Sequence, residues 1–279
     1  MKSSLLPAIL LLIISIQCTA NPCGINQHKT ITAKVSLVVD GDTLRITNGK
    51  KTIRLLGINT PEGSTEMSPP DPLSGHASHA IKTLLKKNNN QILFVRAKNA
   101  SGKKDRYGRV LAHVFTKDGK NVQQHLLEKG FAFNMIYPPN LTFQSCYKAA
   151  ALKARNSRLG LWRHKYYKPL EVSTLNDNNV HGLKLMDAGY RGRNFNHITG
   201  IVKSVRRSKR SLWINFQNNR LSIRIARKNL HYFTDYPPQD LTGKRIVVSG
   251  YITRNRSRHP RASKYYMVLR HPDMMRIQK

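Results

Sequence analysis

Acidic side chains are scarce in this sequence. Of its 279 residues, 14 are Asp or Glu whereas 48 are Lys or Arg, which gives a formal net charge of +34. The shortage covers both halves of the chain, because residues 21–179 carry 25 basic and 10 acidic side chains and residues 180–279 carry 22 and 4. This distribution excludes a neutral protein with a basic tail. It favours a polyanionic partner, with nucleic acid ahead of an anionic membrane surface or a polysaccharide.

Long apolar runs are also absent. The run from Leu5 to Ile16 has twelve residues, whereas a membrane-spanning helix needs about 20. The run follows Lys2 and precedes small residues at 18–20, as in a secretory signal peptide. We therefore expect residues 1–20 to be removed by cleavage and the mature protein to be secreted or periplasmic. We expect no transmembrane segment in the mature chain. Cys18 also permits a lipoprotein, but the bulky residues before it disfavour that alternative.

Cysteine is nearly missing. If Cys18 leaves with the signal peptide, Cys23 and Cys146 remain. Two thiols in an oxidising compartment suggest one disulfide, which would tie the N-terminal arm (residues 21–30) to a later helix. The alternative is a pair of free or buried thiols. Zinc is excluded, because the eleven histidines are scattered without paired metal-binding spacing.

The predicted strands and helices follow the same strand-helix-strand plan in both halves of the chain. In the first half, apolar alternation and helical periodicity predict strands at 31–39, 44–47, 51–58 and 91–97, a strand after 105–109, and helices at 76–87, 121–129 and 145–157. In the second half they predict strands at 198–205, 211–216, 221–226, 245–252 and 265–269, with a helix at 228–233. We expect a mainly β protein with helices (α+β). Its domains would be 31–165 and 191–279, joined by a polar, Asn-rich linker at 166–190. The second domain has the strand order of a small OB-fold barrel.

The second domain combines apolar alternation with a basic surface. Leu221, Ile223 and Ile225 alternate with Arg220, Ser222 and Arg224, so the first three should face the core and the others solvent. Aromatic residues are interleaved with arginines at Trp213, Phe216, Tyr251, Tyr265, Tyr266, Arg206, Arg207, Arg210, Arg254, Arg256, Arg258 and Arg261. Such a surface suits single-stranded nucleic acid, although Phe216 has the phase of a core residue.

Scarce carboxylates gather at two strand ends of the first domain. Asp40 and Asp42 lie in a turn, and Glu62 follows the next apolar strand. Carboxylate oxygens are ligands for hard cations such as Ca²⁺, and a carboxylate that the metal leaves free can deprotonate a water. Arg54 and Arg109 add guanidinium groups, which bind phosphate bidentately. The parts suit phosphoryl chemistry if the fold brings them together.

Four segments then carry a family resemblance. VVDGDTLRI, IRLLGINTPE, DRYGRVLAHVF and GKNVQQHLLEKGFA occur in this order, and together they resemble the staphylococcal nuclease (thermonuclease) family over residues 31–162. The resemblance implies a five-stranded OB-type barrel with three helices. It also implies a Ca²⁺-dependent endonuclease that hydrolyses phosphodiester bonds in DNA and RNA and leaves 3′-phosphate ends.

The resemblance assigns catalytic roles to three residues. Arg54 and Arg109 match the arginines that bind the scissile phosphate and stabilise its developing charge. Glu62 matches the carboxylate proposed to activate the attacking water. The family's nucleotide contacts fall on Tyr107 and Tyr137.

The metal positions include one departure from the family. Asp42 matches a direct ligand, the Thr60 carbonyl matches a second, and Asp40 and Thr43 match supporting positions. Asn59 stands where an acidic ligand is expected. Because an amide oxygen can still coordinate Ca²⁺, we expect weaker metal binding or a relaxed choice of metal rather than lost activity.

Two further departures concern the substrate. Met135 stands where a second nucleotide-contacting tyrosine is expected, and the loop 64–75 is rich in proline rather than basic residues. Substrate preference therefore stays open. The main alternative is a non-catalytic nucleic-acid binder on the same fold; a cationic envelope protein would explain the charge but not the ordered motifs. No stable protein partner is implied.

Overall fold

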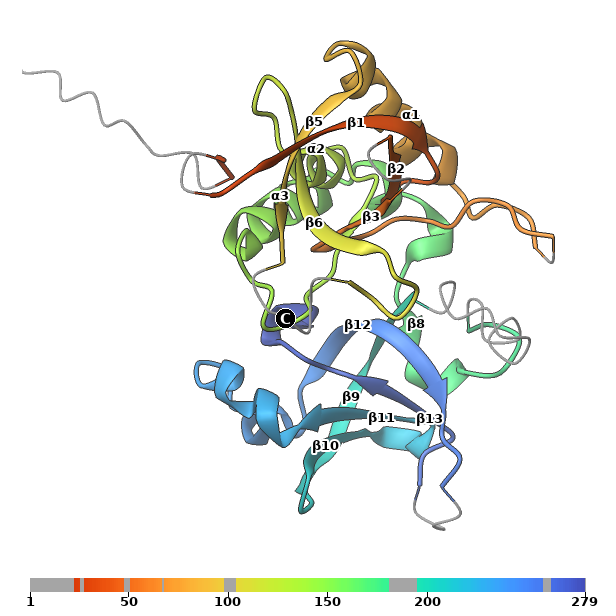
Figure 1. The fold of residues 1–279 in the computed structure, drawn as a ribbon. Helices are drawn as coiled ribbons and strands as arrows, with labels where there is room; N and C mark the ends of the chain where they lie inside the picture. The colour runs from red at the N-terminus through yellow and green to blue at the C-terminus, as the bar shows by residue number, and fades with distance from the viewer. Residues whose placement is uncertain are drawn as a thin grey trace, which may run out of the picture.

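Two β-barrels make up the chain in a computed structural model, one built from the red-to-green half and one from the blue half (Figure 1). The structure describes residues 23–278 except 26–27, 48–50, 67, 98–103, 181–194 and 258–261. The predicted signal peptide lies outside these residues. Of the helices in the described part, none is long and apolar enough to cross a membrane.

The first barrel has five strands and is closed in the order β1-β2-β3-β6-β5. Its strands are β1 (Ile31–Val38), β2 (Thr43–Ile46), β3 (Thr52–Leu55), β5 (Gln91–Arg96) and β6 (Val110–Thr116). The helices around it are α1 (Ser74–Lys86), α2 (Val122–Glu128) and α3 (Gln144–Asn156). The predicted α+β fold with three helices is confirmed, with helix ends within two residues of those expected.

One predicted strand is broken. Residues 51–58 form β3 and then a turn at Gly57, after which β4 (Ile58–Asn59) leaves the barrel and pairs with β7 (Phe133–Asn134). Gly57 has φ 82°, a conformation that favours glycine, and its carbonyl accepts a hydrogen bond from the Met135 N–H at 2.9 Å. The break carries Asn59 out of the barrel wall toward the second half of the molecule.

The core of the first half contains a buried imidazole. His113 on β6 is buried, and its Nδ1 lies 2.9 Å from the Tyr147 hydroxyl on α3. Burial, with a smaller contribution from nearby His28, lowers the pKa of His113 to about 3. His113 is therefore a neutral packing residue, as its strand alternation suggests. A disulfide joins Cys23 to Cys146 on α3, the pairing proposed from the sequence.

The second barrel also has five strands. β9 (Phe195–Arg207), β10 (Ser211–Phe216), β11 (Leu221–Ala226), β13 (Tyr265–Val268) and β12 (Arg245–Arg254) follow one another around it, and pairing between β12 and β9 closes the ring. β14 (Met275–Ile277) extends one edge. The predicted helix at 228–233 is a 3-10 helix, Arg227–Phe233.

Core alternation in β11 is confirmed with one exception. Leu221, Ile223 and Ile225 are fully buried. Ser222, expected to face solvent, is also buried, because its hydroxyl donates to Asn215 Oδ1 at 2.9 Å and accepts from Ser263 at 2.9 Å. The small side chain is covered by polar neighbours rather than by water.

The described part of the predicted linker is packed, not extended. Within it, β8 (Leu170–Glu171) pairs in parallel with β9, and Leu175 and Val180 are buried in the core of the second barrel. Asp177 accepts a short hydrogen bond from the Tyr265 hydroxyl. The structure thus attaches residues 170–180 to the second barrel.

The two barrels contact each other directly. Ile136 of the first half is buried in the core cluster of the second barrel. The Phe133 and His197 rings lie 4.5 Å apart, and Lys148 on α3 pairs with Asp273 at 2.6 Å. These contacts hold a groove between the barrels in a defined shape.

Candidate active site

The turn between β1 and β2 is fitted closely against the rest of the first barrel. The Asp42 N–H donates to Asp40 Oδ1 at 2.9 Å. A Cβ on Gly41 would come within 2.5 Å of Ala77 Cβ and 2.7 Å of Thr60 Oγ1, so only glycine allows this approach. The turn thereby places Asp42 beside the backbone of Thr60.

Asp42 is buried among donors. Its Oδ1 accepts from the Thr43 hydroxyl at 3.0 Å, and its Oδ2 pairs with Arg54 Nη2 at 2.7 Å and accepts from the Thr60 N–H at 3.4 Å. Burial raises the pKa of Asp42 to about 6, while Arg54 opposes the rise and Asp40 adds to it. The carboxylate therefore lies in a place where negative charge is only partly compensated.

Arg54, on β3, is held by four acceptors. Nη1 donates to the Leu55 carbonyl at 2.7 Å and to the Ile58 carbonyl at 3.1 Å. Nη2 pairs with Asp42 and lies 3.4 Å from Asn59 Oδ1. Among the described residues none accepts from Nε. The guanidinium is thus fixed in direction, with one N–H left for a ligand.

Glu62 has a fixed backbone and an unengaged carboxylate. Its N–H donates to Asp71 Oδ2 at 3.1 Å, and its carbonyl accepts from the Asp71 N–H at 2.9 Å. The side chain lines the groove and makes no hydrogen bond within the described part of the chain. Burial raises the pKa of Glu62 to about 7; Asp42 and Asp40 add to the rise and Arg54 opposes it.

Arg109 is positioned by a loop that Asp105 organises. Asp105 Oδ1 accepts from the N–H groups of Tyr107 and Arg109 at 2.9 and 3.0 Å, and its Oδ2 pairs with Arg109 Nε at 2.7 Å. Gly108 gives the turn its positive φ of 77°. Arg109 Nη1 reaches Thr43 Oγ1 at 3.4 Å, which brings this loop to the turn of Asp42. Nη2 has no acceptor among the described residues, so Arg109 has more donors free than Arg54.

The predicted nucleotide-contacting tyrosines both line the groove. The Tyr107 side chain is 64% exposed, with the Arg106 guanidinium 4.7 Å from its ring centroid. Tyr137 is 37% exposed, and Arg270 of the second barrel lies 4.8 Å from its ring centroid. The exposed faces suit stacking against bases, and the flanking guanidiniums suit phosphate.

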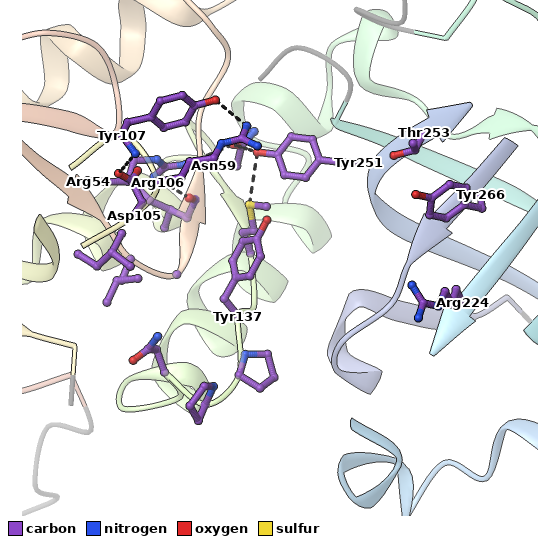
Figure 2. A pocket seen from close by; sticks show the side chains of 18 of the residues that line it. Arg54, Asn59, Asp105, Arg106, Tyr107, Tyr137, Arg224, Tyr251, Thr253 and Tyr266 are labelled. Atoms are coloured by element: carbon purple, nitrogen blue, oxygen red, sulfur yellow. Dashed lines mark hydrogen bonds between the residues drawn. The ribbon is translucent and has the colours of Figure 1, made fainter. Parts of the chain in front are cut away.

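These side chains share one cavity of about 1650 Å³ between the barrels. Figure 2 shows Arg54, Asn59, Tyr107 and Tyr137 on one side and Arg224, Thr253 and Tyr266 on the other, with the Tyr251 side chain beside Asn59. The structure therefore brings together the predicted residues Asp40, Asp42, Arg54, Asn59, Glu62, Tyr107, Arg109 and Tyr137. Thr60 and Thr43 contact Asp42 from behind this surface.

The second barrel contributes a basic and aromatic wall. Trp213 on β10 lies opposite Arg224 on β11. Tyr266 on β13 lies opposite Ser222, which is two residues before Arg224 on β11. All three line the cavity, together with Arg210, Lys228, Arg254 and Arg256. The other two aromatics of the predicted surface, Phe216 and Tyr265, are buried in the core.

Asn59 has partners other than those predicted. Its Oδ1 accepts from the Tyr251 hydroxyl of the second barrel at 2.9 Å and from Arg54 Nη2 at 3.4 Å. Its Nδ2 donates to the Thr60 carbonyl at 3.5 Å. The amide oxygen that was expected to bind a metal is therefore turned toward donors. Met135, the other departure from the family pattern, is buried with its Sδ 3.8 Å from the same Tyr251 hydroxyl.

A hard cation fits the remaining donors. Within the described residues, His, Cys, Asp and Glu do not form a metal-binding group of three or more. However, Asp42, the neighbouring Asp40 and the Thr60 carbonyl provide oxygen donors of the kind that Ca²⁺ and Mg²⁺ prefer. Burial is the main cause of the raised pKa of Asp42, and a cation beside the carboxylate would favour its charged form.

Two functional residues were missed from the sequence. Asp105 had a local signal, because an Asp at the start of a Gly-containing turn commonly accepts from the backbone two residues on. Tyr251 was seen as a basic-surface aromatic, but its contact with Asn59 joins residues 192 positions apart. No sequence pattern connects them.

Comparison with known proteins identifies the family of the first barrel. A family model described as staphylococcal nuclease homologue matches residues 52–164. The chain is 32% identical over 161 residues to a thermonuclease of Staphylococcus hyicus, which covers 56% of this chain and 91% of that protein. It is 32% identical over 154 residues to endonuclease YncB of Bacillus subtilis, covering 54% and 71% of the two chains. It is 36% identical over 132 residues to the SPbeta prophage-derived endonuclease YokF of Bacillus subtilis, a match that covers 46% of this chain and 43% of that protein. Taken with the barrel and the site, these matches show that the chain belongs to the staphylococcal nuclease family.

Proposed function

We propose that this protein is a nuclease that hydrolyses phosphodiester bonds of both DNA and RNA with Ca²⁺ as its cofactor. The observation that carries the proposal is the single cavity into which separate segments bring Asp42, Arg54, Glu62 and Arg109. Relatives named endonuclease and thermonuclease support the same reaction. A divalent metal follows from the family, and the oxygen donors described above support Ca²⁺.

The residues divide the chemistry among them. Arg109, with its free Nη2, binds the scissile phosphate, and Arg54 offers Nε from a guanidinium that four acceptors hold in place. Glu62, whose carboxylate has no hydrogen-bond partner in the described chain, accepts a proton from the attacking water. Asp42 and the Thr60 carbonyl would hold the cation, which supplies positive charge against the phosphate oxygens.

The reaction consumes one water per bond. The water oxygen joins phosphorus, Glu62 takes its proton, and the bond from phosphorus to the 5′ oxygen breaks. The 5′ oxygen takes a proton from solvent and leaves as a hydroxyl, Glu62 returns its own proton to solvent, and a 3′-phosphate remains. Developing negative charge on the phosphate oxygens is stabilised by the two guanidiniums.

The second barrel serves as a nucleic-acid-binding module in this proposal. Trp213 and Tyr266 provide stacking surfaces, and Arg224 provides charge, on the wall opposite the catalytic residues. The disulfide between Cys23 and Cys146 supports a secreted or periplasmic location, because such bonds persist in oxidising compartments.

The test is cleavage of DNA and RNA by the purified protein in Ca²⁺ and in chelator. We expect metal-dependent cleavage, product ends that lose phosphate to a phosphatase that removes 3′-phosphates, and a loss of roughly 10³-fold in kcat for Glu62→Gln. Glu66→Gln, at an exposed position of the neighbouring loop, is the matched control and should keep full activity. Binding without any cleavage in Ca²⁺ would favour the non-catalytic binder.

A further inference from the structure

A tyrosine of the second barrel reaches into the catalytic groove of the first. Tyr251 lies on β12, and its ring packs edge-on against Phe195 at a centroid distance of 5.4 Å. Its hydroxyl crosses to the first barrel and donates to Asn59 Oδ1 at 2.9 Å (Figure 2). Burial raises the pKa of Tyr251, which keeps the phenol protonated and able to donate.

The direction of the Asn59 amide is set by its neighbours. Arg54 has only donors, so the atom that faces its Nη2 must be the amide oxygen rather than the nitrogen. The nitrogen then faces the Thr60 carbonyl, an acceptor. Each of the two amide atoms has a chemically matched partner, and the reversed amide would set donor against donor and acceptor against acceptor.

The contact continues as a chain of polar groups. Tyr251 donates to Asn59 Oδ1, the same oxygen accepts from Arg54 Nη2, and Nη2 pairs with Asp42 Oδ2 at 2.7 Å. The short link is the one from Tyr251, because the distance from Asn59 to Arg54 is 3.4 Å. Without the hydroxyl, Asn59 would keep only two long hydrogen bonds, to Arg54 at 3.4 Å and to the Thr60 carbonyl at 3.5 Å, and its side chain would be held less firmly beside Arg54.

We propose that Tyr251 is a positioning residue: acting through Asn59, it holds Arg54 in the direction needed at the scissile phosphate, and it makes the second barrel part of the active site. This inference rests on the proposed nuclease function. It replaces the predicted role of Asn59 as a metal ligand with a role as the link between the barrels.

Tyr251→Phe tests the proposal, since it keeps the ring and removes the hydroxyl. We expect kcat to fall about tenfold, KM for nucleic acid to stay within twofold, and the Kd for Ca²⁺, measured by calorimetry, to stay within threefold. Tyr265→Phe is the control, because it removes a hydroxyl that bonds to Asp177 within the second barrel and lies away from the groove. It should lower Tm but leave kcat unchanged.

A double-mutant cycle with Asn59→Ala identifies the route. If Tyr251 acts through Asn59, kcat of the double variant equals that of Asn59→Ala alone. Multiplied losses in the double variant would overturn the proposal, as would an unchanged kcat in Tyr251→Phe. A rise in KM without a fall in kcat would make Tyr251 a substrate contact instead, and a tenfold weaker Kd for Ca²⁺ would make it part of the metal site.

The urea midpoint of unfolding separates this inference from the proposed function. The wild type, the two single variants and the double variant should show non-additive losses in the urea midpoint. Tyr251→Phe and Asn59→Ala both remove the same hydrogen bond, so the second change has no such bond left to remove. If the wild type fails to cleave nucleic acid in Ca²⁺, the proposed function fails whatever the midpoints show. If it cleaves and the midpoints are additive, the inference about Tyr251 alone is wrong.

Discussion

The two barrels share an architecture and divide the groove by charge. Each is closed by five strands. All the acidic residues that line the cavity (Asp40, Asp42, Glu62 and Asp105) belong to the first barrel, whereas the second contributes arginine, lysine, tryptophan and tyrosine. Under the proposed function, one barrel carries the reaction chemistry and the other contacts the substrate. The difference lies in the residues at the loops and outer strand faces, not in the barrels themselves.

The strongest way to break this division is Arg109→Ala. It removes a guanidinium that has more free donors than Arg54, so kcat/KM should fall roughly 10³-fold, about 4 kcal/mol of transition-state stabilisation. Steady-state cleavage of a short oligonucleotide measures it. Arg163→Ala, an exposed arginine outside the groove, is the control. A fall in kcat/KM of less than tenfold would show that the scissile phosphate binds elsewhere.

The core of the first barrel should make it sensitive to acid. His113 has a folded pKa of about 3, below its unfolded value near 6.5, so below pH 6.5 the unfolded chain binds the extra proton and stability falls. Between pH 7 and pH 5 the wild type should lose about 2 kcal/mol more than His113→Gln. Urea unfolding at several pH values measures the difference. Parallel pH profiles for the two proteins would show that His113 does not titrate on unfolding.

The second wall should act on binding rather than on chemistry. Trp213→Ala removes a stacking surface, so KM for single-stranded DNA should rise about tenfold while kcat stays within twofold. Tyr236→Ala changes an exposed aromatic of the second barrel that lies outside this groove, and it should leave both constants unchanged. A fall in kcat with constant KM would contradict the division between the walls.

Asn59→Asp tests Ca²⁺ binding at the contact between the two barrels. Tyr251 and Arg54 would hold one carboxylate oxygen, and the other would replace Nδ2 opposite the Thr60 carbonyl. Two oxygens facing each other are stabilised by a cation between them, so calorimetry should give a Kd for Ca²⁺ about fivefold lower. Asn178→Asp, on the surface of the second half, controls for added charge. An unchanged Kd would mean that the cation binds away from Thr60.

Local parts of the site were predictable from sequence because each depends on a few neighbouring residues. The turn at Asp42 needs a glycine at one position, and the loop before Arg109 needs an aspartate and a glycine in fixed places. The barrel strands followed from apolar alternation. Where such patterns are local and one face of the element is buried, the sequence specifies the structure well.

The sequence was least informative where distant segments contact one another. The family resemblance predicts that Asn59 binds the metal, and this stays a prediction; in the structure its amide oxygen accepts a hydrogen bond from Tyr251, 192 residues away. The strand at 51–58 looked continuous, yet pairing of β4 with β7 draws its end out of the barrel. Polar residues 170–180 resembled a linker, although buried Leu175 and Val180 fasten them to the second barrel.

The position of β12 has a consequence for the timing of activity. β12 closes the second barrel by pairing with both β9 and β13, and it also carries Tyr251. Under the proposal above, a chain released from the ribosome before β12 would keep the contacts of Arg54 with Leu55, Ile58 and Asp42 but would lack the hydrogen bond from Tyr251 to Asn59. Cleavage would then be about tenfold slower until the second barrel had closed, so completion of folding would itself raise the rate of the nuclease.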